Sequence, residues 1–197
     1  SRLLDTIGDI LDLSKIEQNK ITIQRTNFNL VHLIQKAVQF YTPMVNRKGL
    51  YINFTTEYQE LIVNLDPVLI DRILGNLISN AVKFTFTGGI RILLEEHKEP
   101  TVSKVVLTIA DTGIGMSPSF LENSIFQSFE QESGGISKVY QGTGLGLHLV
   151  KKYIDEQDGS IWVESQKNIG STFFIMFRQP LREKHNNHQN ETENITY

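Results

Sequence analysis

The sequence predicts an α/β (α+β) sandwich, in which a mixed sheet of about five strands is covered on one face by three helices. Long amphipathic segments and alternating, strand-like segments are both present, and they do not follow one another as regular βαβ units. The chain has 197 residues, of which 40% are hydrophobic, so it is long enough for one sizeable domain with its own core.

Capping residues define the three predicted helices. Asn29 is a suitable N-cap and Gly49 a suitable end for the first. Asp66 followed by Pro67 predicts the start of the second, because aspartate caps a helix and proline fits its first position. The third is predicted over 145–156, directly after a glycine-rich turn.

Alternation of apolar and polar residues predicts the strands. Segments 50–58 and 61–65 are expected to form a hairpin-like pair. Residues 111–141 lose all periodicity, and a loop of that length inside a compact domain is usually functional. The other predicted strands are 20–30, 88–98, 103–111, 160–165 and 171–177.

The two ends of the chain differ from the domain between them, which is predicted over 21–179. Residues 1–20 form an amphipathic helical pattern that is marginal alone and needs a partner helix. Residues 180–197 are polar and aperiodic, which is typical of a disordered tail. The apolar stripe of the first segment consists of Leu3, Leu4, Ile7, Ile10 and Leu11.

Composition excludes several functional classes. A formal net charge of −3 provides no positive field, so no nucleic-acid partner is expected. The absence of cysteine excludes disulfides, thiolate metal sites and cysteine nucleophiles. No apolar run approaches the roughly 20 residues that span a bilayer, and no secretory signal is visible, so a soluble chain is expected.

The first polar cluster lies in the segment NLISNAVKFT. Asn76, Asn80 and Lys83 stand at i, i+4 and i+7, so they project from one face of an otherwise apolar helix. A phosphate with its magnesium ion would satisfy all three, with amide oxygens on the metal and the lysine on phosphate oxygens. The alternative is that the three side chains simply face solvent.

The second cluster is IADTGIGMS, in which Asp111 ends a strand and Gly113 and Gly115 follow. An ordinary turn explains it equally well. Alternatively, the carboxylate accepts a hydrogen bond from an exocyclic amine, and the glycines let a flat ring approach the backbone.

The third cluster is QGTGLGLHLVKKY, with glycines at 142, 144 and 146. No Gly-Lys-Ser/Thr follows, which excludes a Walker loop, and the G-x-G-x-G spacing is one residue short of the Rossmann fingerprint. A glycine turn at a helix N-terminus favours an anion. Close packing of a helix against a sheet is an equal alternative.

Taken together, these segments resemble the catalytic, ATP-binding domain of two-component sensor histidine kinases. NLISNAVKFT is similar to the N box, DTGIGM to the G1 box, IFQSFEQ to the F box and GTGLGLHLVKKY to the G2 box. The resemblance implies the Bergerat-type fold of the ATPase superfamily that includes gyrase, heat-shock-90 chaperones and mismatch-repair ATPases. It extends from Leu3 to Phe177, since residues 1–20 resemble the second helix of the dimerisation domain.

The resemblance implies a protein histidine kinase that transfers the γ-phosphoryl group of Mg-ATP to a histidine on a dimerisation helix. Asn80 would be the magnesium ligand, assisted by Asn76, and Lys83 would hold phosphate oxygens. Asp111 would accept from the adenine amine. The implied ATP-binding residues are Asn80, Lys83, Asp111, Gly113, Gly115, Lys138, Gly142, Thr143, Gly144, Leu145, Gly146 and Thr172.

The resemblance also implies partners and a place in the cell. Residues 132–141 would form a mobile lid over ATP. Partners would be the phosphoacceptor helix, a response-regulator receiver domain and a second subunit in the full-length protein, located in the cytoplasm or in the cytoplasmic part of a membrane-bound sensor.

Two departures from the family pattern stand out. Ser128 replaces the usual F-box proline, and no histidine is followed by Asp or Glu, so the phosphoacceptor is expected outside this chain. His148 is expected on a helix surface. Two alternatives remain: a degenerate kinase that binds nucleotide or a partner, and a conformational ATPase of the same superfamily.

Overall fold

The computed structural model describes residues 7–8, 11, 14, 22–130 and 143–181. Residues 7, 8, 11 and 14 are helical, and Ile7 and Leu11 are exposed. The rest of the predicted helix over 1–20, the predicted lid and most of the predicted tail lie outside the described residues. Among the described helices, none has the length and apolarity that crossing a membrane requires.

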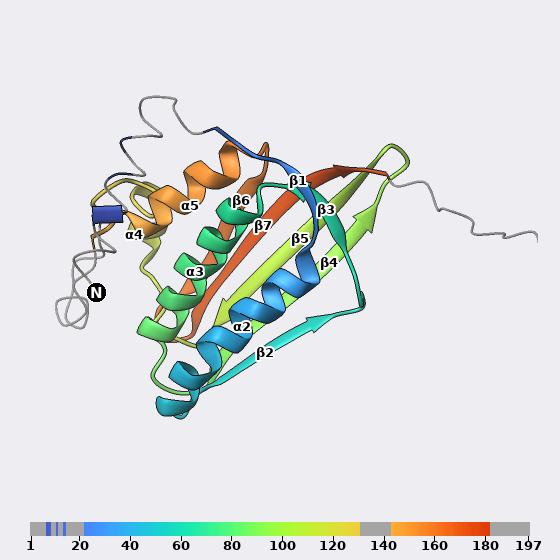
Figure 1. The fold of residues 1–197 in the computed structure, drawn as a ribbon. Helices are drawn as coiled ribbons and strands as arrows, with labels where there is room; N and C mark the ends of the chain where they lie inside the picture. The colour runs from blue at the N-terminus through green and yellow to red at the C-terminus, as the bar shows by residue number, and fades with distance from the viewer. Residues whose placement is uncertain (1–6, 9–10, 12–13, 15–21, 131–142, 182–197) are drawn as a thin grey trace, which may run out of the picture.

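A five-stranded mixed sheet forms one layer of the molecule, in the order β2-β4-β5-β7-β6 (Figure 1). β2 runs parallel to β4, and the other neighbours are antiparallel. The strands are β2 (Tyr51–Thr56), β4 (Gly89–Lys98), β5 (Val102–Asp111), β6 (Ser160–Gln166) and β7 (Gly170–Pro180).

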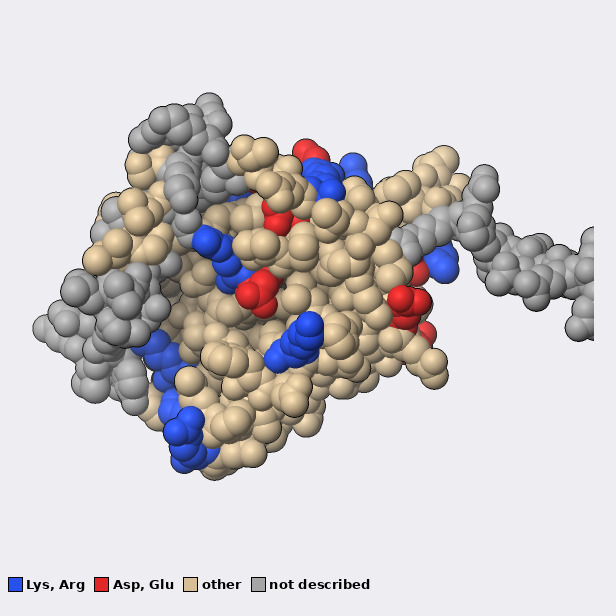
Figure 2. All heavy atoms as spheres, viewed as in Figure 1, with Lys and Arg blue, Asp and Glu red and all other residues tan. Residues whose placement is uncertain are grey.

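Three helices cover one face of this sheet, with α3 between α2 and α5 (Figure 1). This arrangement confirms the predicted sandwich. Figure 2 shows the helix-covered side as a largely uncharged surface, with lysine and arginine side chains at several places and some of them gathered at the lower left, near the C-terminal ends of α2 and α3. The helices are α2 (Leu30–Arg47), α3 (Pro67–Phe84) and α5 (Gly146–Asp155).

The core lies between the helices and the inner face of the sheet. Alternate residues of the central strands point inward and are buried, as the period of two requires. The inward side chains of the three central strands include Ile90, Ile92, Leu94, Val105, Leu107, Ile109, Phe173, Ile175 and Phe177.

The hairpin-like pairing predicted for 50–58 and 61–65 is wrong. β2 pairs in parallel with β4, with Tyr51 opposite Gly89. β3 (Ile62–Leu65) instead pairs antiparallel with β1 (Thr26–Asn29) in a separate two-stranded sheet. Alternation along a strand identifies its buried face but not its neighbour, because the partner is selected by tertiary packing.

A short helix, α4 (Pro118–Asn123), lies inside the predicted loop over 111–141. The sequence signal was the pair Ser117-Pro118, a common way to start a helix. The helix was not predicted, because six residues are too few for a readable period.

Asp66 fixes the start of α3. Its Oδ1 accepts hydrogen bonds from Val68 N at 2.9 Å and Leu69 N at 3.2 Å, and its Oδ2 accepts one from Gln24 N at 2.8 Å. The Asp66 backbone N–H donates to Gln157 Oε1 just beyond α5, at 2.7 Å. Asp66 is only 6% exposed, so these bonds replace solvent.

We expect Asp66→Ala to lower the free energy of unfolding by about 2 kcal/mol, near the upper end of measured N-cap losses. The value is high because three backbone N–H groups lose their acceptor. Urea unfolding measures the change. Asp71→Ala, at an exposed site on the same helix, is the matched control. Equal effects of the two substitutions would contradict the capping role.

Candidate functional site

Asn76, Asn80 and Lys83 lie on one face of α3 and are all half-buried. Asn76 Nδ2 donates to the carbonyl of Arg72 in the same helix, at 3.1 Å. Among the described residues, no hydrogen bond reaches the side chain of Asn80. A half-buried amide in this state can accept a ligand without first breaking a bond within the protein.

Asp111 ends β5 on the inner face of the sheet, and it is half-buried. Its Oδ1 accepts a hydrogen bond from Gly113 N at 2.8 Å. Burial raises the pKa of this carboxyl above its ordinary value, and hydrogen bonds from the backbone N–H groups of Gly113 and Ser171 oppose that rise. The desolvation effect is the larger of the two.

The loop after Asp111 has no room for side chains at its glycines. A Cβ added to Gly113 would lie 2.6 Å from the carbonyl oxygen of Phe84, and one added to Gly115 would lie 1.9 Å from that of Gln166. Gly115 also has a positive φ of 60°. Both glycines are therefore required for close backbone packing, whatever the loop binds.

This loop is tied to two other parts of the chain. Ile114 N donates to Phe84 O at the end of α3, at 3.2 Å. On the other side, Asn168 N donates to Ile114 O at 2.7 Å and Met116 N to Ser165 Oγ at 2.9 Å. Sequence reasoning missed Ser165 and Asn168, because a lone serine or asparagine near a turn carries no specific signal.

The glycine turn before α5 contacts α3 directly. A Cβ on Gly146 would lie 2.9 Å from Asn76 Oδ1, so the start of α5 lies against the polar face of α3. Gly144 has a φ of 71°, and Leu145 N donates to Thr143 Oγ1 at 3.3 Å. Leu145 is fully buried, so its side chain belongs to the core. Lys138 and Gly142 lie outside the described residues.

The F-box segment is held against α5. Phe129 N donates to Gly144 O at 3.1 Å, and the Phe129 side chain is 65% exposed. Phe126 is partly buried against the core, and its carbonyl lies 2.9 Å from Nδ1 of His148. His148 is thus half-buried and joins the F-box segment to α5, a contact that its place in the sequence did not reveal.

Thr172, which the resemblance implied as an ATP-binding residue, is paired with Ala110 in the strand register. Strand alternation turns it to the sheet face opposite the helices, where Phe174 stacks on Trp162 with ring centroids 5.2 Å apart. Ser171 is the β7 residue paired with Asp111, and it is buried. A pattern of two adjacent hydroxyl residues cannot say which one faces inward, because that depends on the register.

Two segments that are distant in sequence therefore meet around the C-terminal half of α3. The start of α5 lies against Asn76, and the loop after β5 is bonded to the end of the helix at Phe84. Oriented amides, a lysine, a half-buried carboxylate and the backbone N–H groups at a helix start are the groups that bind a nucleotide with its metal.

Residues 65–182 match the family described as histidine kinase-, DNA gyrase B-, and HSP90-like ATPase. The autoinducer 2 sensor kinase/phosphatase LuxQ of Vibrio cholerae is 37% identical over 186 residues, which cover 92% of this chain and 21% of that protein. The chain thus spans about a fifth of the length of this curated relative.

Solved structures share the fold. ShkA, crystallised at full length with AMPPNP, superposes with a TM-score of 0.79 at 24% identity, covering 92% of this chain and 37% of that one. The histidine kinase ThkA, crystallised with the response regulator TrrA, has a TM-score of 0.65 at 24% identity, covering 90% of this chain and 49% of that one.

Proposed function

The chain belongs to the histidine kinase-, DNA gyrase B-, and HSP90-like ATPase family, and from this premise we propose that it is the ATP-binding catalytic part of a sensor histidine kinase. Residues 21–179 would form the catalytic domain, and residues 1–20 part of the second dimerisation helix. The observation that carries the proposal is the meeting of the loop after Asp111 and the turn before α5 on one helix, α3.

ATP fits the groups that α3 brings together. Asp111 would accept a hydrogen bond from the exocyclic amine of adenine, and the tightly packed loop at Gly113 and Gly115 would form the wall beside the ring. Lys83 would neutralise phosphate oxygens from the last turn of α3. The turn at Gly144 and Gly146 would present backbone N–H groups at the start of α5 to the phosphates.

The donor set also fits a magnesium ion. The side chain of Asn80 is half-buried and makes no hydrogen bond with other described residues, so its oxygen is available as a ligand. Asn76, one turn earlier and beside Gly146, would position a water of the metal. When bound, the ion would neutralise charge that develops on the phosphate oxygens.

The proposed reaction moves the γ-phosphoryl group from ATP to an imidazole nitrogen. The bond from the γ-phosphorus to the bridging oxygen breaks, a P–N bond forms, and ADP leaves. Lys83, Asn80 and the backbone at Gly144 would act by positioning and charge neutralisation, which is the main contribution of proteins to phosphoryl transfer.

The proposed partners follow from the same assignment. The acceptor histidine would lie on a dimerisation helix of the same protein or of its dimer partner, and the phosphoryl group would pass to an aspartate of a receiver domain. The complex of ThkA with the response regulator TrrA supports this type of partner. The catalytic part would work in the cytoplasm.

The proposal is tested by incubating this chain with radiolabelled ATP and a separately supplied helix that carries a histidine, and then measuring the label on the helix. We expect label on that histidine. ATP binding without transfer to any supplied helix would favour a degenerate kinase, and undetectable ATP binding would refute the proposed function.

Asp111→Asn should weaken ATP binding and stabilise the free protein. Asparagine keeps an oxygen that can accept from adenine but loses the charge. A hydrogen bond to a charged group contributes about 1.5–3 kcal/mol and a neutral one about 0.5–1.5 kcal/mol, so we expect a loss of roughly 5- to 30-fold in affinity. Titration calorimetry measures the affinity. Without a buried charge at this site, the free energy of unfolding near neutral pH should rise.

The pH dependence of the free energy of unfolding, compared between the wild type and Asp111→Asn, provides a separate check on the burial of this carboxylate. Because burial raises the pKa of Asp111 in the folded state, ionisation costs stability as pH increases from the ordinary aspartate value of 3.8 to the raised value. The wild type should lose stability in this window relative to Asp111→Asn. Parallel stability curves would contradict the burial effect, and unchanged ATP affinity would contradict the adenine contact.

A further inference from the structure

The C-terminus of α3 is held by groups from outside the helix. A helix leaves its last four carbonyl groups without intrahelical partners. Here the carbonyl of Ala81 accepts from Thr85 N at 3.0 Å, and that of Phe84 accepts from Ile114 N at 3.2 Å. The carbonyls of Val82 and Lys83, and that of the C-cap Thr85, require another donor.

Lys48 supplies it. Its Nζ donates to the carbonyls of Val82 at 2.5 Å and Thr85 at 3.1 Å, and lies 3.4 Å from that of Lys83. The same ammonium lies 5.4 Å from the centroid of the Phe86 ring. Three carbonyl contacts, made by one cation 34 to 37 residues away in sequence, fix the end of α3 to the end of α2.

The backbone of Lys48 is itself anchored. Lys48 is the C-cap of α2, and its N–H donates to the carbonyls of Asn46 and Val45. Gly49 then turns the chain with a φ of 70° into β2. The side chain therefore starts from a fixed point and reaches α3 at its negative dipole end, where a cation is stabilising.

We propose that Lys48 is a positioning residue for the nucleotide site, an inference that rests on the proposed function of that site. The turn that Lys48 holds carries Lys83, and it presents the Phe84 carbonyl to the loop that follows Asp111. Lys48 thereby fixes the phosphate-binding and adenine-binding segments relative to each other. It acts through the α3 backbone and does not itself touch nucleotide.

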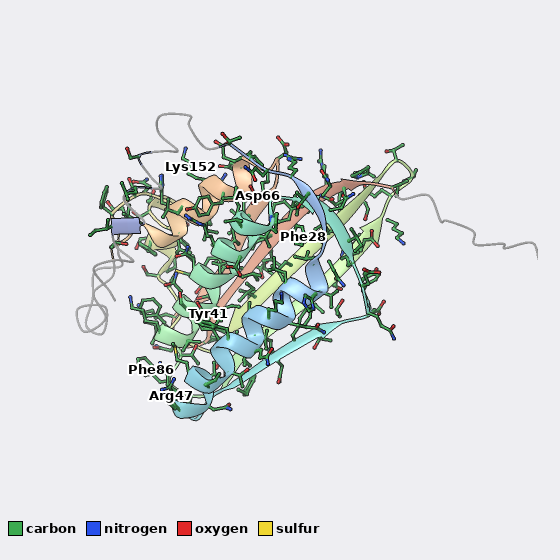
Figure 3. All side chains as sticks on the ribbon, in the orientation of Figure 1. Phe28, Tyr41, Arg47, Asp66, Phe86 and Lys152 are labelled. Carbon is green, nitrogen blue, oxygen red and sulfur yellow. The ribbon has the colours of Figure 1, made fainter. Side chains whose placement is uncertain are left out.

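Lys48→Met tests the inference, because methionine keeps most of the apolar stem and lacks the ammonium. Arg47→Met is the matched control. Arg47 is the neighbouring exposed cation, and among the described residues its Nε bonds within α2, to Pro43 O at 3.1 Å. Figure 3 shows Arg47 and Phe86 together at this end of the helix layer, away from Asp66 at the start of α3.

Two measurements are made well below the unfolding transition of each variant. In Lys48→Met, the dissociation constant for Mg-ATP should rise about five- to tenfold, the effect of losing about one hydrogen-bonded contact. The amide of Ile114 should exchange with solvent at least about fivefold faster in the nucleotide-free protein. Lys48→Arg should restore both in part, and Arg47→Met should change neither by more than about twofold.

The outcomes separate the inference from the proposed function. If Lys48→Met changed neither the exchange rate of the Ile114 amide nor the affinity for Mg-ATP, the inference would be overturned. This holds even if the variant were less stable, because loss of a lysine with a purely structural role would lower stability and leave both measurements unchanged. If the wild type bound no nucleotide, the proposed function would fail. In that case Ile114 exchange would still decide whether Lys48 fixes the loop.

Discussion

Asn80→Ala should reduce phosphoryl transfer to a supplied histidine by on the order of 1,000-fold. A metal ion contributes several kcal/mol to stabilising the charge of such a transition state, and each 1.4 kcal/mol corresponds to a tenfold rate change. Asn80 is the half-buried amide on α3 that has no hydrogen bond with other described residues, so its proposed role is to bind a ligand. Initial rates with radiolabelled ATP measure the effect.

Stability distinguishes this role from a structural one. Asn80→Ala should leave the free energy of unfolding within about 0.5 kcal/mol of the wild type, because no described group loses a hydrogen-bond partner. Asn46→Ala, at an exposed position near the end of α2, is the control for transfer and should remain fully active. Full activity of Asn80→Ala would mean that Asn80 only faces solvent, which is the alternative that the sequence left open.

Gly115→Ala should lower the free energy of unfolding by about 3 kcal/mol. A residue with a Cβ loses about 1–2 kcal/mol in the left-handed region, and Gly115 has a φ of 60°. The new Cβ would also lie 1.9 Å from the carbonyl oxygen of Gln166, which is backbone and cannot turn away. Overpacking of this kind adds about 1–3 kcal/mol.

Gly49→Ala separates the two contributions. Gly49 has a similar φ of 70°, but a Cβ there would meet nothing within 4 Å. We expect this variant to lose only the conformational part, about 1 kcal/mol. Urea unfolding of both variants gives the comparison. Equal losses would show that the packing of Gly115 against Gln166 contributes nothing.

Local patterns determined most of the elements of this fold. The helix caps at Asn29 and Asp66 and the period-two alternation of the central strands each depend on a few neighbouring residues. The one-sided helical layer followed from the same patterns, because amphipathic helices need one sheet face to cover. The glycine-rich turns were also predicted from the sequence. At Gly113 and Gly115 the structure shows that glycine is required because the backbone of other segments packs closely against them.

Tertiary structure decided what joins these elements. The pairing of β2 with β4, the inward position of Ser171 in place of Thr172, and the reach of Lys48 to the end of α3 all link residues far apart in sequence. The alternation within one strand does not identify which strand lies beside it. A lysine at the end of a helix has the same local sequence pattern whether it faces solvent or contacts another helix. These contacts depend on the free energy of packing the whole domain, and a short segment of sequence does not determine that free energy.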